Sequence, residues 1–245
     1  MTRTYDAAYL ERLQTLLAEA KQHSYALLDA RPGEVVVDVG CGLGHDAAVL
    51  AATGATVIGL DHDEELLMRA RGLHGHSIAF HQRPAEATGL ATGSVDKMRF
   101  DRILQHIAEH APVLAEVQRV LKPGGLLQVV DADYLSLSFF LPDLALERKL
   151  LDALAHRFPG SRPLRHLPDS LHLLGFGKPT IDVLQLLVYG FDAANTLIRL
   201  DKVVHEQVGA GYISPAELAV WEAWKTSDRC FFSINHVIIQ ARKEA

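Results

Sequence analysis

The chain has 245 residues, of which 49% are hydrophobic and 22% are charged, a composition typical of a folded globular protein. Its 24 basic and 30 acidic residues give a net charge of −6 without a long block of either sign, which argues against a groove for nucleic acid. The sequence has no apolar run near the ~18 residues of a membrane span, and its two cysteines lie far apart. We therefore expect a soluble cytoplasmic protein with no nucleic-acid or membrane partner, no disulfide framework and no zinc site.

The first half of the chain alternates between helical and strand patterns. Residues 5–30 carry apolar side chains at helical spacing and end at a Pro-Gly turn, so they predict one or two amphipathic helices ahead of the main fold. A strand, a helix and a second strand are then expected at residues 35–39, 45–53 and 56–60. A glycine-rich turn follows the first strand and Asp61 follows the second, which together describe one βαβ unit.

The alternation continues to the end of the chain, with more helix in the second half. Further strands are predicted at residues 77–81, 95–100, 126–131, 179–189 and 230–241. Helices are predicted at residues 63–72, 109–121, much of 135–174, 192–208 and 215–228. Because each crossover between parallel strands returns over one face, this pattern predicts an α/β fold with a doubly wound sheet. We find no internal repeat or linker and expect a single domain over residues 1–245.

The segment Val36-Val-Asp38-Val-Gly40-Cys-Gly42-Leu-Gly44-His-Asp is the most informative in the sequence. Glycines directly after a buried strand let the backbone approach a ligand at a helix N-terminus. A tight turn without a ligand would have the same pattern. The dinucleotide fingerprint Gly-x-Gly-x-x-Gly would need a third glycine where His45 stands, so the strict nicotinamide pattern fails.

Two carboxylates near this turn indicate which ligand it takes. Asp61 stands 17 residues after Gly44, where an acid can accept both hydroxyls of an adenosine ribose. Asp38, two residues before Gly40, would repel a pyrophosphate but attract the amino group of S-adenosylmethionine (SAM). Asp38 could instead serve the helix N-terminus, and Asp61 could cap the next helix. Taken together, the pair favours SAM over a nicotinamide cofactor.

These segments, with Gly59-Leu-Asp61 and with Arg119-Val-Leu-Lys-Pro-Gly-Gly125 before a strand, resemble the class I SAM-dependent methyltransferases. The resemblance spans residues 33–134 and is greatest to the small-molecule branch that includes ubiquinone-biosynthesis and natural-product enzymes. It implies a Rossmann-like sheet of seven strands in the order 3-2-1-4-5-7-6, with the last strand antiparallel and helical lid insertions. It also implies SAM as cofactor and S-adenosylhomocysteine (SAH) as product.

The resemblance divides the single domain into parts and assigns its cofactor site. The parts are an N-terminal helical cap (1–32), a cofactor-binding core (33–134), a helical lid (135–178) and closing strands and helices (179–245). The implied cofactor-binding residues are Asp38, Gly40, Cys41, Gly42, Gly44, Asp61, His62, Ala85, Glu86 and Phe100. The family usually has an aspartate for the adenine amino group where this chain has Pro84, which leaves that contact to the backbone of Ala85 or to Glu86.

The thirteen histidines raise the question of which one does chemistry. Methyl transfer is a direct displacement that depends mainly on alignment, and a base with a pKa near neutrality helps when the acceptor arrives protonated. His106 follows the fourth strand and is the candidate general base, although it could simply orient a loop. Tyr134 follows the fifth strand and lines either the substrate pocket or an ordinary loop. We expect no metal, because Asp131-Ala-Asp133 lacks the rest of a magnesium ligand set.

The sequence therefore predicts a SAM-dependent methyltransferase that acts on O, N or C of a small, apolar or aromatic metabolite. The apolar character comes from the predicted lid and from Trp221 and Trp224, a pair that we expect to be core in preference to a dimer contact. An alternative is a SAM-binding protein of the same fold that assists a non-methylating reaction. Asp38 and His45 disfavour a nicotinamide oxidoreductase. The chain is expected to be a monomer or a homodimer.

Overall fold

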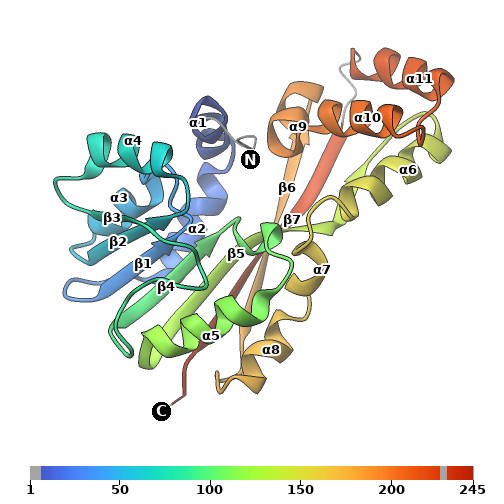
Figure 1. Cartoon of the computed structure of the whole chain (residues 1–245). Helices are drawn as coiled ribbons and strands as arrows, with labels where there is room; N and C mark the ends of the chain where they lie inside the picture. The colour runs from blue at the N-terminus through green and yellow to red at the C-terminus, as the bar shows by residue number, and fades with distance from the viewer. Residues whose placement is uncertain (1–6, 227–230, 245) are drawn as a thin grey trace.

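The computed structural model describes residues 7–226 and 231–244, and in them one mixed sheet of seven strands (Figure 1). The strands are β1 (Val35–Val39), β2 (Thr56–Asp61), β3 (Ala79–Gln82), β4 (Val95–Asp101), β5 (Leu121–Phe139), β6 (Thr180–Tyr189) and β7 (Phe231–Arg242). They lie in the order β3-β2-β1-β4-β5-β7-β6, and β7 is antiparallel to both of its neighbours while the other pairs are parallel. This confirms the predicted fold class, strand order and direction of the last strand.

Helices surround the sheet and take up most of the connections between strands. They are α1 (Ala7–Leu16), α2 (Ala18–Leu28), α3 (His45–Ala51), α4 (Glu64–His74), the 3₁₀ turn η1 (Leu104–His106), α5 (His110–Val120), α6 (Leu144–Ala155), α7 (Ser161–Leu164), α8 (Leu167–Leu173), α9 (Phe191–Ile198), α10 (Leu200–Gly209) and α11 (Pro215–Lys225). Asp63 and Asp143 cap α4 and α6, and Ser214 forms a capping box with Glu217 ahead of α11. Within the described residues, no helix is both long enough and apolar enough to cross a bilayer.

The central strands are buried on both faces, because helices cover both sides of the sheet. Successive residues of a strand point to opposite sides and so enter different clusters. Val36 of β1 packs in a cluster with α2, α3 and α4, whereas Val37 and Val39 pack in a second cluster with α5, α7 and α8. In β5, Leu126 belongs to the first of these clusters and Leu127 to the second. The nearly continuous apolar runs of these strands follow from burial on both sides.

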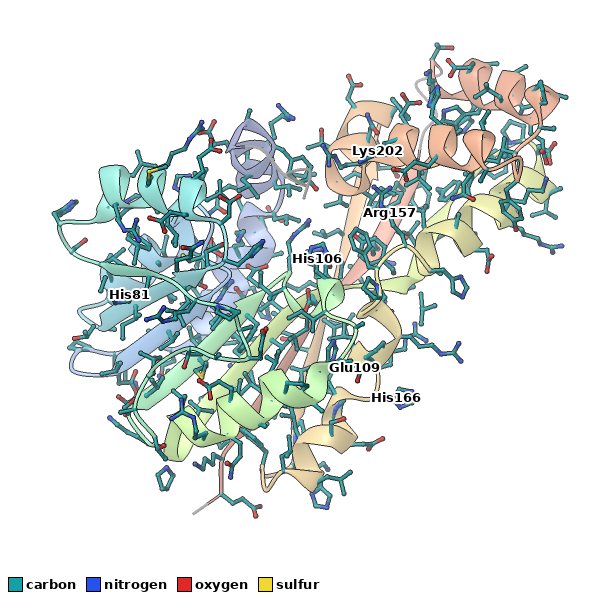
Figure 2. The ribbon with its side chains drawn as sticks, viewed as in Figure 1. His81, His106, Glu109, Arg157, His166 and Lys202 are labelled. Carbon is teal, nitrogen blue, oxygen red and sulfur yellow. The ribbon has the colours of Figure 1, made fainter. Side chains whose placement is uncertain are left out.

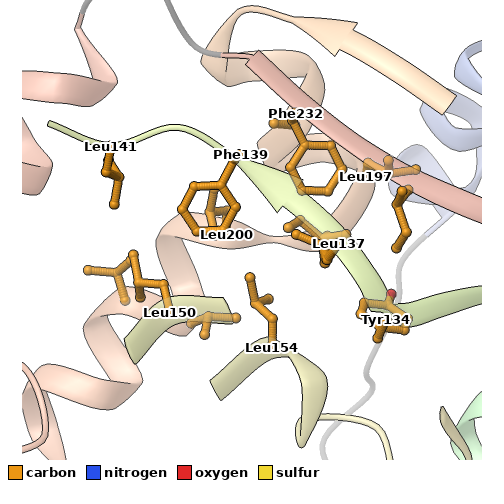
Figure 3. Packing of buried hydrophobic residues seen from close by; sticks show 14 of the residues in the cluster. Tyr134, Leu137, Phe139, Leu141, Leu150, Leu154, Leu197, Leu200 and Phe232 are labelled. Atoms are coloured by element: carbon orange, nitrogen blue, oxygen red, sulfur yellow. The ribbon is translucent and has the colours of Figure 1, made fainter. Parts of the chain in front are cut away.

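A third cluster lies where β5, β6 and β7 extend past the other strands, under α6, α9, α10 and α11 (Figures 1 and 3). Its members from β5, β7 and α6 include Leu137, Phe139, Leu150, Leu154 and Phe232. Trp221 and Trp224 are 0% and 5% exposed within it, which confirms that the Trp pair is core. Residues of α1 join the same cluster, so the N-terminal helix and the later helices share one core.

Two segments differ from the sequence-based expectation. The predicted helical lid at 135–178 starts later, because β5 continues to Phe139 and pairs there with Phe232 of β7. The residues Leu135-Ser-Leu137-Ser-Phe139 alternate with the period of a strand, so the signal is present in the sequence. The single helix predicted at 192–208 is in fact two helices, since Arg199 has a left-handed backbone with φ 54° and separates α9 from α10. Asp228 and Cys230, at the ends of two predicted elements, lie outside the described residues.

A layer of polar contacts joins α2 to the sheet. Strand side chains donate hydrogen bonds to three carbonyl oxygens near the end of α2, from Lys97 to Asp29, from Gln128 to Ser24 and from Gln240 to Leu27. The carbonyls of Leu27 and of the C-cap Asp29 lie past the last intrahelical acceptor, and β7 and β4 supply donors for them, while β5 adds a second donor at Ser24 one turn earlier. The N-terminal helices are therefore fixed to the sheet by direct hydrogen bonds as well as by apolar packing.

We expect Leu150→Ala to lower the free energy of unfolding by about 2–5 kcal/mol, because Leu150 is fully buried in the third cluster and the change leaves a cavity. Chemical denaturation of the full chain measures this loss. Leu173→Ala is the matched control, since Leu173 is 85% exposed on α8 and its truncation should change stability by less than ~0.5 kcal/mol. Equal effects of the two changes would contradict the packing described here.

Candidate functional site

The glycine turn after β1 has a backbone that only glycine adopts readily. Gly40, Gly42 and Gly44 have φ values of 73°, 52° and 76°. A Cβ at Gly40 would lie 2.0 Å from Cδ1 of Ile103, whereas a Cβ at Gly42 would meet only Leu10, at 3.5 Å. The turn is therefore closely packed on its inner side at Gly40 and open at Gly42.

Asp61 at the end of β2 holds the glycine turn in place. Its Oδ2 accepts a hydrogen bond from the Gly42 backbone N–H at 2.8 Å, and its Oδ1 accepts one from the Asp63 N–H at 2.9 Å. The carbonyl oxygen of Leu60 accepts hydrogen bonds from the N–H groups of Gly40 and Cys41 as well. Asp61 is 6% exposed, so this carboxylate is a buried part of the turn that links its backbone to the start of α4.

Asp38 is the second carboxylate of the turn and is almost unpartnered. Its Oδ1 lies 3.7 Å from Nη1 of Arg99, and its Oδ2 is buried with no hydrogen-bond donor among the described residues. Burial raises the pKa of Asp38 to about 7, since the nearby positive charge of Arg99 offsets only part of the desolvation and Asp46 adds a repulsion. A buried acceptor without a donor is uncommon in native proteins and fits a site that a cationic donor of a ligand completes.

Arg99 lies fully buried in the middle strand β4, below the glycine turn. Its guanidinium donates to Asp46 at 3.1 Å, to Asp101 at 2.7 Å and to the Ser24 hydroxyl at 3.0 Å. Burial by itself would lower the pKa of Arg99, but the carboxylates of Asp101 and Asp46 raise it above its ordinary value. The pKa of Asp101 is held well below its usual range, because attraction to Lys21 and Arg99 outweighs desolvation. We call Arg99, Lys21, Asp38, Asp46 and Asp101 the buried charge cluster.

Asp46, in the first turn of α3, connects this cluster to both N-terminal helices. Oδ1 accepts from Gln14 of α1 at 3.2 Å and from the Tyr25 hydroxyl of α2 at 2.8 Å. Oδ2 accepts from Lys21 of α2 at 2.5 Å and from Arg99. Four donors from three elements meet at one carboxylate, so the position of the N-terminal helices depends directly on the helix that follows the glycine turn.

The two candidate catalytic residues lie beyond the end of β4 and inside β5. Tyr134, which we expected just after the fifth strand, lies within β5 because that strand continues to Phe139. His106 lies at the end of η1 near the middle of the molecule (Figure 2), and its ring packs edge-on against Phe158 with centroids 5.0 Å apart. Tyr134 is only 2% exposed, and its ring also packs against Phe158, with centroids 4.5 Å apart. The structure brings the two predicted residues together through Phe158, a residue that the sequence did not single out.

His106 does not have the neutral-range pKa that the sequence analysis sought in a base. The pKa of His106 is lowered to about 4, mainly by desolvation and to a smaller extent by the positive charge of Arg102. Its Nε2 lies 3.0 Å from Nε2 of Gln105, a contact in which the amide is the donor. The imidazole is therefore neutral around pH 7, with its acceptor nitrogen Nε2 engaged by Gln105 and its proton on Nδ1.

Two further titratable groups lie in the same part of the sheet: sequence reasoning considered Asp131 only as a possible magnesium ligand and did not single out His236. Asp131 Oδ2 accepts from the Leu104 N–H at 3.1 Å and so holds η1, while its Oδ1 has no partner among the described residues. Burial raises the pKa of Asp131, with repulsion from Asp101 adding to it. His236 of β7 is 2% exposed, and burial lowers its pKa to about 4. The register of β5 against β7 places His236 opposite Ala132, one residue along from Asp131.

The remaining predicted cofactor residues are placed as follows. Cys41 is buried in the turn, and burial raises the pKa of its thiol. The His62 side chain is 88% exposed beside Asp61, and Glu86 is exposed on the loop after β3. Phe100 is 1% exposed in the core on the α5 side of the sheet, and Ala85 packs on the edge of the same cluster. Their roles toward a cofactor stay predictions.

A cavity of about 620 Å³ lies between α1 and the α9–α10 pair, and none of the predicted site residues lines it. Its lining includes Arg12, Arg199 and Lys202, the last labelled in Figure 2. Nearby, Asp201, His205 and Glu222 lie close enough together to hold an ion. Lys225 and the Trp221 indole already donate to Asp201, so this group is an ion-pair network on the surface of the third cluster.

Comparisons with known proteins identify the family. A family model described as a methyltransferase domain matches residues 30–158. An uncharacterised 37.1 kDa protein in transposon TN4556 of Streptomyces fradiae is 33% identical, over 97% of this chain and 71% of that protein. The uncharacterised methyltransferase sll0829 of Synechocystis is 33% identical over 57% of this chain and 68% of its own length.

The chain belongs to the class I SAM-dependent methyltransferases. In fold, this methyltransferase resembles the YcgJ protein from Bacillus subtilis, with a TM-score of 0.66 at 18% identity over 91% of this chain and 99% of that one. The [4+2]-cyclase SpnF also has the fold, with a TM-score of 0.54 at 18% identity over 93% of this chain and 80% of that one. The resemblance that the glycine turn and Asp61 suggested is thus confirmed for the family.

The raised pKa of Asp38 makes the stability of this methyltransferase depend on pH. The folded chain keeps the Asp38 proton at pH values where the unfolded chain has already released it, so this group favours folding at low pH. That contribution is lost as the pH rises from about 4, the ordinary pKa, to about 7, the folded one. We therefore expect Asp38→Asn to stabilise the ligand-free protein, and by about 2 kcal/mol more at pH 8 than at pH 5.

Denaturation in urea at the two pH values, without ligand, measures this difference. Asp46→Asn is the matched control, because Asp46 also contacts Arg99 but accepts hydrogen bonds from four donors. That change should destabilise the protein at both pH values. A gain for Asp38→Asn that is the same at pH 5 and pH 8 would rule out the raised pKa.

Proposed function

We propose that this protein transfers a methyl group from SAM to O, N or C of a small acceptor with an apolar or aromatic body. The observation that carries the proposal is the pair of carboxylates beside the glycine turn, above all the buried, donor-free Oδ2 of Asp38. A phosphate-bearing cofactor would meet repulsion there, whereas an ammonium group would supply the missing donor and offset the cost of burying the charge.

In this proposal the chain's own residues bind and align rather than react. Asp38 accepts from the cofactor's amino group, Asp61 from its ribose, and the open side of Gly42 lets the backbone approach it. Bound SAM supplies an electrophilic methyl group on a positively charged sulfur. Because the reaction is a direct displacement, alignment of the acceptor and exclusion of water supply most of the rate enhancement.

The acceptor side of the proposal rests on the aromatic group of His106, Phe158 and Tyr134. The Phe158 ring contacts both of the others, and the three rings form an aromatic surface, which suits a planar or hydrophobic acceptor. Arg157 reinforces this surface, since its guanidinium stacks on Phe158 with Cζ 5.7 Å from the ring centroid. To accept a hydrogen bond from the acceptor's nucleophilic group, neutral His106 exchanges the Gln105 amide at Nε2 for that group.

A non-methylating reaction on the same fold is the competing proposal, and the likeness to the cyclase SpnF shows that the fold by itself does not set the reaction. Release of SAH with formation of a product heavier by one methyl group supports methyl transfer. Product formed without SAH would overturn the proposal in favour of the competing one. Binding of a nicotinamide cofactor without binding of SAM, measured by calorimetry, would overturn both.

We expect Asp61→Ala to weaken SAH binding by about 1–3 kcal/mol, because it removes the acceptor for two backbone N–H groups and for the proposed ribose contact. Isothermal titration calorimetry measures the loss, and thermal unfolding of the ligand-free variant shows whether the fold is intact. His76→Ala is the control, because His76 is exposed just after α4, is not among the predicted cofactor-binding residues, and its removal should leave the affinity unchanged. A dissociation constant for Asp61→Ala equal to that of the unmodified protein would refute the ribose role.

We expect His106→Ala to lower turnover at saturating SAM by about 10²-fold if His106 accepts the acceptor's proton, with SAH affinity unchanged. Because the pKa of His106 is lowered to about 4, its protonation should reduce turnover only as the pH falls toward 4, and no inflection near pH 6.5 should depend on it. Initial rates of SAH release across the pH range measure both effects. Unchanged turnover in the variant would exclude a role in proton transfer.

A further inference from the structure

Strand β6 forms one edge of the sheet and lacks the usual protection of an edge strand. It pairs with β7 over ten residues in an unbroken register, and its other side pairs with no strand in the part of the chain that the structure describes. Edge strands are commonly shielded by lysines, prolines or bulges, because unpaired N–H and C=O groups recruit other strands. Its sequence, TIDVLQLLVY, contains no lysine or proline.

The single charge in β6 does not shield the edge either. Asp182 points to the α2 side of the sheet, where the His23 ring contacts its carboxylate at 2.6 Å. The hydrogen bond from His23 lowers the pKa of Asp182, so this carboxylate stays ionised and held by α2 at neutral pH. The rest of the strand is uncharged, and nothing in its chemistry would repel a second strand of the same kind.

The other face of β6 carries a row of exposed apolar side chains. Ile181, Val183, Leu187 and Tyr189 are 55%, 50%, 48% and 71% exposed, and they alternate along the strand so that all lie on one side. On the neighbouring strand β7, Ile239 faces the same way and is buried against the α5, α7 and α8 cluster. The helical cover therefore stops before β6. Contiguous exposed apolar surface of this kind on a protein commonly marks an interaction site.

The order of these residues makes the strand complementary to itself. If two copies of β6 pair antiparallel about a two-fold axis through Gln185, Ile181 lies opposite Tyr189 of the second copy and Val183 lies opposite Leu187 of the second copy. Asp182 then faces Val188 of the second copy, so no like charges meet. The same patch contacts itself, as a two-fold interface requires. A shift of the axis to Leu186 would leave Ile181 without an apolar partner on the strand.

We propose that β6 pairs with β6 of a second copy of this chain, so that the two sheets join into one across a two-fold axis at Gln185. Ten residues of strand span ~33 Å, which makes a small interface by the standard of specific complexes, and we expect a dissociation constant in the micromolar range. Three strands separate β6 from β1 and the glycine turn, so pairing leaves the proposed site of either copy uncovered. The inference is independent of the proposed function.

Sedimentation equilibrium of the full chain, from low to high micromolar concentration, tests the self-association. We expect a reversible dimer, and we expect Val183→Lys to make the protein monomeric throughout because it puts a charge opposite Leu187 of the second copy. Leu73→Lys is the matched control, since Leu73 is 52% exposed on α4 at the other end of the sheet and the variant should dimerise normally. Unchanged far-ultraviolet circular dichroism and thermal unfolding in both variants show that the fold is intact. A monomer at every concentration, or a dimer unaffected by Val183→Lys, would overturn the proposal.

Disulfide trapping tests the register itself. Residues opposite each other in an antiparallel pair have Cα atoms about 4.5–5.5 Å apart, within disulfide range. In a Cys230→Ser background, with Cys41 buried, Gln185→Cys should cross-link to itself under mild oxidation. Val183→Cys by itself should not, but it should cross-link when mixed with Leu187→Cys. Equal cross-linking of Gln185→Cys and Val183→Cys alone would show a different interface and overturn the proposal.

Discussion

The burial of Arg99 in the middle of the sheet is the constraint on which the site depends. A guanidinium in the interior is tolerable only when carboxylates and other acceptors surround it, because desolvation of an unpaired charge costs several kcal/mol. Asp46, Asp101 and Asp38 come from three different strands or helices and meet at Arg99. The same contacts fix the end of β1, the start of α3 and the end of β4, which are the three pieces of backbone around the glycine turn.

The N-terminal helices are part of this arrangement and not a separable cover. Asp46 is shared by Gln14, Lys21, Tyr25 and Arg99, so α1 and α2 cannot move without leaving acceptors in the interior without donors. Carbonyl oxygens near the end of α2 depend in turn on side chains of β4, β5 and β7. The helices over the sheet and the turn below them are therefore expected to order cooperatively, since each satisfies polar groups of the other.

Sequence reasoning reached the fold and the turn because their signals are local. Glycines after a β-branched run, Asp61 at a strand end and a Pro-Gly-Gly stop before the fifth strand are readable without knowing what packs against them. The buried charge cluster was not readable in this way. In β4 the charged residues Lys97, Arg99 and Asp101 alternate with Met98 and Phe100, a pattern typical of a strand with one face in water. That face is covered by α2, and only the positions of Lys21 and Ser24 across the interface explain why the charges are tolerated.

Asp38 shows how this cluster reconciles stability with binding. Arg99 donates hydrogen bonds to Asp46 and Asp101, whereas the nearest oxygen of Asp38 lies 3.7 Å from Arg99 and the other has no donor. The raised pKa of Asp38 reflects this lack of partners in a buried position. Natural selection for stability alone would remove such a group, because replacing an unsatisfied buried carboxylate costs the fold nothing. Its presence beside three glycines with left-handed backbones is what a site retains when the missing donor comes from a ligand. Oδ2 of Asp38 lacks a hydrogen-bond donor in the ligand-free protein, and the same atom is the proposed contact for the ammonium group of the cofactor. The cost of leaving this oxygen unpaired and the proposed affinity for a cationic cofactor therefore have the same cause.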